Sequence, residues 1–182
     1  MDASKIAQIL NAGGVVIHPT ETVYGLFCDA TNPVAVLKVY RIKNRPIGKS
    51  FPLLVKDINM LMDYAIVTDK PKKIVKSAKV PTNFIFKAKN LSPLVTQKKS
   101  AAFRISKNAK IKKLFQHFDK PIVATSANIA GQKPISDPRT YKEVFGEKAN
   151  LIDAVIFAGI NRKTKGSKIV DLTKVKPVVV RK

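Results

Sequence analysis

The stretch VVIHPTETVYGL, residues 15–26, begins as a buried strand and then turns abruptly polar. Val15, Val16 and Ile17 form the apolar start, and a run with a proline, two threonines and a glutamate follows. Polar residues that follow a buried strand lie at its carboxyl edge, where open α/β sheets bind their ligands. The alternative is an ordinary loop in which the threonines form a turn. The stretch by itself leaves both interpretations open.

Short apolar segments alternate with amphipathic ones along the whole chain. Segments that lack a helical period predict strands at residues 15–18, 52–55, 84–86, 101–106, 121–125, 154–157, 168–172 and 178–180. Helices are predicted at 4–11, capped by Ser4, at 33–42, capped by Asn32 with Pro33 in the first turn, and at 69–77, 109–118 and 139–145. This alternation predicts an α/β fold in a single domain, residues 1–182, with helices packed on a twisted mixed sheet. The closing strands have no helices between them, so that part of the sheet is expected to be antiparallel.

The composition narrows the class of protein. Cys28 is the only cysteine, which excludes a disulfide framework and a thiolate metal cluster, and we expect it in the core. His18 and His117 are far apart and lack metal-binding spacing, so no metal site is predicted. No apolar run reaches the length of a membrane span, and the N-terminus lacks the features of a signal peptide. We therefore expect a cytoplasmic protein that does not contact a membrane.

The charge is strongly unbalanced. Lys and Arg number 34 against 12 Asp and Glu, a formal net charge of +22. Such a field attracts polyanions and steers anionic ligands such as nucleotides. The lysines are scattered along the chain, which favours a solvated surface for most of them. A nucleic-acid surface and a phosphate-binding site in a basic background both remain open.

Basic residues gather in RIKNRPIGKSFPLLV, residues 41–55, just before a predicted strand. They could be a solvated helix end, where cations favour the negative pole of the helix dipole. Pro46, however, disfavours helical geometry at Arg45. In an extended segment residues two apart point the same way, so we expect Lys43 and Arg45 to converge on one anionic ligand.

Two further elements carry polar groups in apolar surroundings. Ser126 and Asn128 follow the strand in PIVATSANIAGQKP, residues 121–134, where their side chains suit a nucleotide or cap a helix. Arg104 lies in the middle of the apolar strand AAFRIS, where it requires an ion-pair partner or a ligand. The sequence contains neither GxxxxGK[ST] nor GxGxxG, which excludes the P-loop and Rossmann phosphate cradles.

Taken in order, these motifs resemble the YrdC-type threonylcarbamoyl-AMP synthases in their short, single-domain form. The resemblance rests on HPTETVYGLFCDA, KNRPIGKSFPLLV, AAFRIS, TSANIAGQKP and SKIVDL, and it spans residues 13–181. It implies a YrdC-like fold around a large basic cavity. It also implies that L-threonine, bicarbonate or CO2, and ATP give L-threonylcarbamoyladenylate and diphosphate. Downstream proteins would then transfer the threonylcarbamoyl group to adenosine 37 of tRNA.

The resemblance also implies roles for individual residues. Lys43 and Arg45 match a Lys-x-Arg pair that serves the ATP phosphates and the substrate carboxylate. Threonine would be bound by Thr20, Arg104 and Ser167, and ATP by Lys43, Ser100, Ser126, Asn128, Pro134 and Arg181. The stretch AKVPTNFIF, residues 78–86, departs from the family's Trp-Pro-Gly-Pro-Leu-Thr run. Mg²⁺ is expected to enter with ATP, held mostly by phosphates and water.

A non-catalytic module that binds tRNA or double-stranded RNA is the main alternative. The net charge of +22 suits contacts to RNA phosphates. Neutral Thr, Ser and Asn clusters at strand ends are not needed for such contacts, and no RNA-recognition motif is present. The sequence therefore favours the enzyme, with a direct tRNA contact left open.

Overall fold

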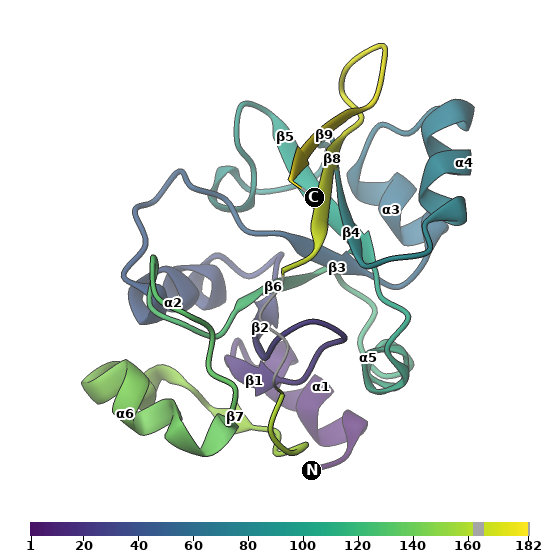
Figure 1. Ribbon diagram of the computed structural model, residues 1–182. Helices are drawn as coiled ribbons and strands as arrows, with labels where there is room; N and C mark the ends of the chain where they lie inside the picture. Colours follow the sequence, from purple (N-terminus) through teal and green to yellow (C-terminus); the bar gives the residue numbers. More distant parts are fainter. Residues whose placement is uncertain (162–165, 182) are drawn as a thin grey trace.

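The computed structural model describes residues 1–161 and 166–181 (Figure 1). Its strands are β1 (Val16–His18), β2 (Gly25–Asp29), β3 (Leu53–Val55), β4 (Thr82–Lys87), β5 (Ser100–Ile105), β6 (Ile122–Ser126), β7 (Ala154–Val155), β8 (Lys168–Asp171) and β9 (Val178–Arg181). Its helices are α1 (Ala3–Asn11), α2 (Pro33–Lys43), α3 (Ile58–Tyr64), α4 (Asp69–Ser77), α5 (Ala109–Leu114) and α6 (Tyr141–Phe145). Short 3-10 helices span Pro93–Val95, Pro138–Thr140 and Gly146–Leu151. The predicted domain also includes residues 162–165 and 182, which lie outside the described residues.

Within the described chain, the strands form one mixed sheet in the order β7-β1-β2-β6-β3-β5-β4-β8-β9. The pairs β1/β7, β3/β5 and β4/β8 are parallel, and the other neighbouring pairs are antiparallel. The closing strands β8 and β9 pair antiparallel, as expected from the absence of a helix between them. The prediction of a mixed α/β sheet is confirmed.

Three strands of the sheet are buried along their whole length. Every residue of β1, β2 and β3 is buried, which explains their almost continuous apolar sequences. Leu53 of β3 lies opposite Phe103 of β5, and both are buried in the core. Helices α1 and α2 pack against β2, and α1 contacts α5 although the two are far apart in sequence. Figure 1 shows α3 and α4 at the upper right and α6 at the lower left. Among the described residues, no helix has the length and apolar character needed to cross a membrane.

Several local predictions differ from the structure. Strand β2 and helix α3 were not predicted: β2 reads as the apolar end of a loop, and its pairing with both β1 and β6 makes it a strand. The cap of α1 is Asp2, not Ser4, since the Asp2 carboxylate accepts a hydrogen bond from the backbone N–H of Lys5. Asn32 caps α2 as predicted, accepting from Val34 N and Ala35 N.

Candidate active site

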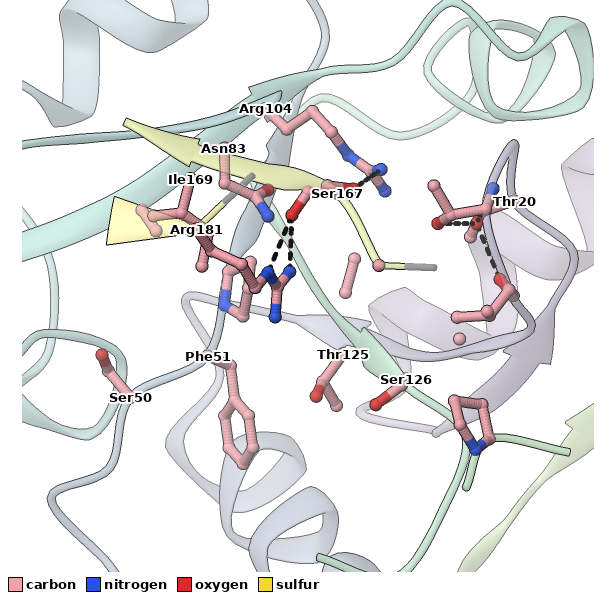
Figure 2. Close-up of a pocket in the computed structure, with 18 of the residues that line it drawn as sticks. Thr20, Ser50, Phe51, Asn83, Arg104, Thr125, Ser126, Ser167, Ile169 and Arg181 are labelled. Carbon is pink, nitrogen blue, oxygen red and sulfur yellow. Dashed lines mark hydrogen bonds between the residues drawn. The ribbon is translucent and has the colours of Figure 1, made fainter. Parts of the chain in front are cut away.

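A cavity of about 550 Å³ lies on one face of the sheet and is bordered by β2, β4, β5, β6, β8 and β9 (Figure 2). Of the residues predicted to form the site, those that line it are Thr20, Arg45, Ser100, Arg104, Ser126, Asn128, Pro134, Ser167 and Arg181. Its charged lining residues, within the described chain, are three arginines, Arg45, Arg104 and Arg181, with no carboxylate. Segments far apart in the sequence therefore meet around one strongly basic cavity.

Lys43 does not line this cavity, and the extended geometry predicted for it is wrong. It is the last residue of α2, and the left-handed Asn44 follows it with φ +49°. Its side chain is buried, and Nζ donates to Ser126 O at 2.6 Å and to Asn128 O and Oδ1 at 2.9 Å. Lys43 and Arg45 therefore do not converge. Arg45 borders the cavity, whereas Lys43 binds the Ser126–Asn128 turn that forms part of the cavity wall.

Two opposing effects act on the charge of Lys43. Burial lowers the pKa of its ammonium to about 7, and the charge of Arg45 adds to this effect. Three oxygen acceptors at hydrogen-bond distance favour the protonated form, because an ammonium has three N–H donors. These acceptors therefore oppose the effect of burial on the pKa of Lys43.

The Ser126–Asn128 turn forms a closed hydrogen-bond network. The Ser126 hydroxyl donates to Asn128 Oδ1 at 2.6 Å, and Asn128 Nδ2 donates to Ile129 O and Gln132 O. The next described helix begins only at Pro138, so the helix-cap alternative for Ser126 and Asn128 is wrong. Because its amide is fully engaged, Asn128 shapes the cavity wall rather than offering a free group.

Thr20 is both a turn-former and a cavity residue. Its hydroxyl donates to Val23 O at 2.7 Å and accepts from the backbone N–H of Thr22 at 3.0 Å. The Thr22 hydroxyl lies 3.0 Å from the same oxygen, and it is the donor there because the Thr20 proton is already used. The two interpretations of the opening stretch are therefore compatible, since the turn itself forms part of the cavity lining.

Arg45 is held at the cavity edge by the loop that follows it. Its Nε donates to Lys49 O at 2.7 Å and its Nη2 to Ser50 O at 3.1 Å. The guanidinium also lies over the ring of Phe51, 5.2 Å from the ring centroid. Figure 2 shows Ser50 and Phe51 across the cavity from Arg104.

Arg104 is buried, and its guanidinium contacts Ser167, which is distant in the sequence. Its Nη1 donates to the Ser167 hydroxyl at 2.6 Å and lies 3.8 Å from Glu21 Oε1. Burial lowers the pKa of Arg104, and the Glu21 carboxylate opposes that shift. The backbone oxygen of Ser167 accepts in turn from Arg181 Nε and Nη2, at 3.0 and 2.6 Å (Figure 2). The expectation that Arg104 needs a partner in an apolar strand is confirmed.

Asn83 is a lining residue that the sequence reasoning missed. It is buried on β4, and it borders the cavity together with Ile85, two residues along the same strand. Phe84 between them faces a second cavity on the other side. The predicted strand starts at residue 84 and therefore excludes Asn83. A prediction that included residue 83 would have placed its side chain on the same face as that of Ile85.

The described residues contain no group of three or more His, Cys, Asp or Glu side chains that could hold a metal ion. The fold and the site define a mixed α/β protein with an arginine-lined cavity on one face of its sheet, and the charge of that cavity favours small anionic ligands. The family model for Sua5, YciO and YrdC proteins, described as "Telomere recombination", matches residues 8–182. The chain belongs to the Sua5/YciO/YrdC family, as the motifs indicated.

Individual relatives agree with this assignment. A protein of Photobacterium profundum named threonylcarbamoyl-AMP synthase is 35% identical over 154 residues, covering 81% of this chain and 83% of its own. The structure of P. abyssi Sua5 complexed with L-threonine matches with TM-score 0.88 and 26% identity, covering 98% of this chain. This chain spans about half of that Sua5 chain, 53%. E. coli YciO matches with TM-score 0.87 and 27% identity over 99% of this chain and 88% of its own.

Proposed function

We propose that this protein is a threonylcarbamoyl-AMP synthase. The observation that carries the proposal is the Arg104–Ser167 pair on the wall of a cavity whose charged lining residues, in the described chain, are arginines. The threonylcarbamoyl-AMP synthase of P. profundum and the L-threonine complex of Sua5 support it. The product would enter the N6-threonylcarbamoyladenosine modification of tRNA adenosine 37 through downstream transfer proteins. We also propose a cytoplasmic location.

The proposed reaction needs positioning and charge stabilisation more than acid–base groups. The free amine of L-threonine forms a carbamate, either by adding to CO2 with loss of one proton to solvent or by condensing with bicarbonate with loss of water. A carbamate oxygen then attacks the α-phosphorus of ATP. The new O–P bond forms as the bond to diphosphate breaks, so this nucleotidyl transfer takes its nucleophile from the substrate. Arg45 and Arg181 would neutralise phosphate charge, and Arg104 with Ser167 and the Thr20 turn would hold threonine.

The remaining predicted residues fit the ATP side of this cavity. Ser100, Ser126 and Pro134 line it, and Lys43 acts through the turn that contains Asn128. Mg²⁺ would enter with ATP and keep phosphate and water ligands, because the lining offers hydroxyls and amides but no carboxylate in the described chain.

Diphosphate release from ATP tests the proposal. We expect release to require both L-threonine and bicarbonate, and Arg45→Ala or Lys43→Ala to reduce it about 100-fold. The exposed Lys49, which does not line the cavity, provides the control Lys49→Ala. Circular dichroism checks that each variant is folded. Release that ignores threonine would refute the proposal, and loss of salt-sensitive RNA binding as the sole effect would favour the RNA-binding alternative.

A further inference from the structure

Glu21 lies behind the cavity wall and forms a largely buried ion pair with Arg104. The Glu21 carboxylate is 3.8 Å from Arg104 Nη1, and the two side chains are 19% and 7% exposed. The residue belongs to the polar run between β1 and β2, whereas Arg104 belongs to β5. The ion pair therefore joins the first loop at the site to the strand that carries its buried arginine.

Few contacts fix the orientation of Arg104. A guanidinium has five N–H donors, and Arg104 uses one, from Nη1, in a hydrogen bond to the rotatable hydroxyl of Ser167. Its Nε is buried and has no hydrogen-bond partner among the described residues. Besides the Ser167 hydrogen bond, the ion pair with Glu21 is the electrostatic contact that the described residues provide to this guanidinium.

Glu21 is itself anchored by Ser106, which directly follows β5, the strand that carries Arg104. Both of its carboxylate oxygens lie 3.1 Å from the Ser106 hydroxyl, which donates to them. The same hydroxyl oxygen accepts from the backbone N–H of Asn108, the cap of α5. The carboxylate is thus held by Ser106, in the short connection between β5 and α5.

Glu21 is not among the lining residues of the main cavity. It borders a separate cavity of about 420 Å³, together with Thr82, Phe84 and Ile105. Arg104 borders the main cavity, so the ion pair crosses the wall between the two. A change at Glu21 reaches a ligand through Arg104, not by direct contact.

We propose that Glu21 is a positioning residue that fixes the Arg104 guanidinium for the carboxylate of the amino-acid substrate. The inference rests on the proposed function for the identity of that substrate. The role differs from that of the neighbouring Thr20, because Thr20 lines the cavity whereas Glu21 would orient Arg104.

Steady-state kinetics of Glu21→Gln test this role, because the substitution keeps the shape and removes the charge. We expect the KM for L-threonine to rise about tenfold or more, with kcat and the KM for ATP changed less than about threefold. Asp153→Asn is the matched control: Asp153 pairs with Lys38 at 3.9 Å and lines neither cavity. It should leave all three constants unchanged. An unchanged KM for threonine, or equal rises for threonine and ATP, overturns the proposal.

A second measurement does not depend on turnover. In NMR spectra of the free protein, the Arg104 Nε–H signal, assigned by its loss in Arg104→Lys, should exchange with solvent about tenfold faster in Glu21→Gln. Unchanged exchange overturns the positioning role. Should Glu21→Gln not fold, Ser106→Ala keeps the charge, releases the carboxylate and must shift both readouts in the same direction. A wild-type enzyme indifferent to threonine would refute the proposed function, while the exchange measurement would still decide the role of Glu21.

Discussion

At the scale of single residues, the site separates groups that border the ligand space from groups that shape it. Lys43 is the clearest example: a buried ammonium donates to three oxygens of the Ser126–Asn128 turn and does not line the cavity. Removing it would leave those buried acceptors without a donor. Lys43, like Glu21, therefore acts on the cavity through residues that line it.

His18, in the stretch that opens the site, makes the fold sensitive to acid. The ring is buried, stacks on Phe27 with centroids 4.9 Å apart, and donates from Nδ1 to Pro19 O at 2.7 Å. Burial lowers its pKa from 6.5 to about 4; the Pro19 hydrogen bond opposes the shift, and Lys110 adds to it. Between these values the unfolded chain binds more protons at His18 than the folded one, so the contribution of His18 to stability is full above pH 6.5 and is lost as the pH falls toward 4.

Urea unfolding at pH 7.5 and 4.5 measures this contribution. The wild type should lose about 2–3 kcal/mol more between the two pH values than His18→Phe, which keeps the ring stacking without the titration. His117→Gln, at an exposed position, is the control. Identical losses in wild type and His18→Phe would contradict the assignment.

At the scale of elements, the end of α2 decides where Lys43 and Arg45 point. Asn44 adopts the left-handed conformation, with φ +49° and ψ +44°, and the backbone N–H of Arg45 bonds to Tyr40 O at 3.1 Å. This cap ends the helix at Lys43. Arg45 then leaves toward the cavity while Lys43 stays in the helix.

Substitution of Asn44 tests the cap. Asn44→Gly should keep the unfolding free energy, because glycine accepts positive φ, whereas Asn44→Val should lower it by about 1–2 kcal/mol. Lys49→Val, a nearby exposed position without positive φ, should change it little. Denaturant unfolding gives the three values. Equal effects of Gly and Val at position 44 would show that the left-handed cap is not what matters.

At the scale of the whole molecule, a net charge of +22 surrounds a cavity whose charged lining, in the described chain, consists of arginines. Raising the salt concentration from about 0.05 to 0.5 M should raise the KM for ATP several-fold with little change in kcat, since screening weakens steering of the polyanion. The KM for zwitterionic L-threonine, measured in the same titration, should change much less. Equal salt dependence for both substrates would contradict this electrostatic role.

Much of the architecture follows from local sequence. Buried strands such as β3, the N-terminal cap of α2 by Asn32, and the antiparallel β8/β9 pair follow from apolar periodicity, cap chemistry and connection length. Strand β2 could not be predicted in this way, because partners on both sides define it. Asn83 could not be predicted as a lining residue for a related reason. It is the second residue of β4, and the first two residues of that strand are polar.

The sequence by itself determined the mixed α/β fold, the family, and nine of the residues that border the cavity, because each of these depends on local patterns and motif order. Only the tertiary structure decided which polar groups border the ligand space and which support it. The Lys43 side chain is directed to the acceptors of the Ser126–Asn128 turn and the Glu21 side chain to the guanidinium of Arg104, and neither residue lines the main cavity. Those partners are distant in sequence, and folding alone brings them within hydrogen-bond or ion-pair distance.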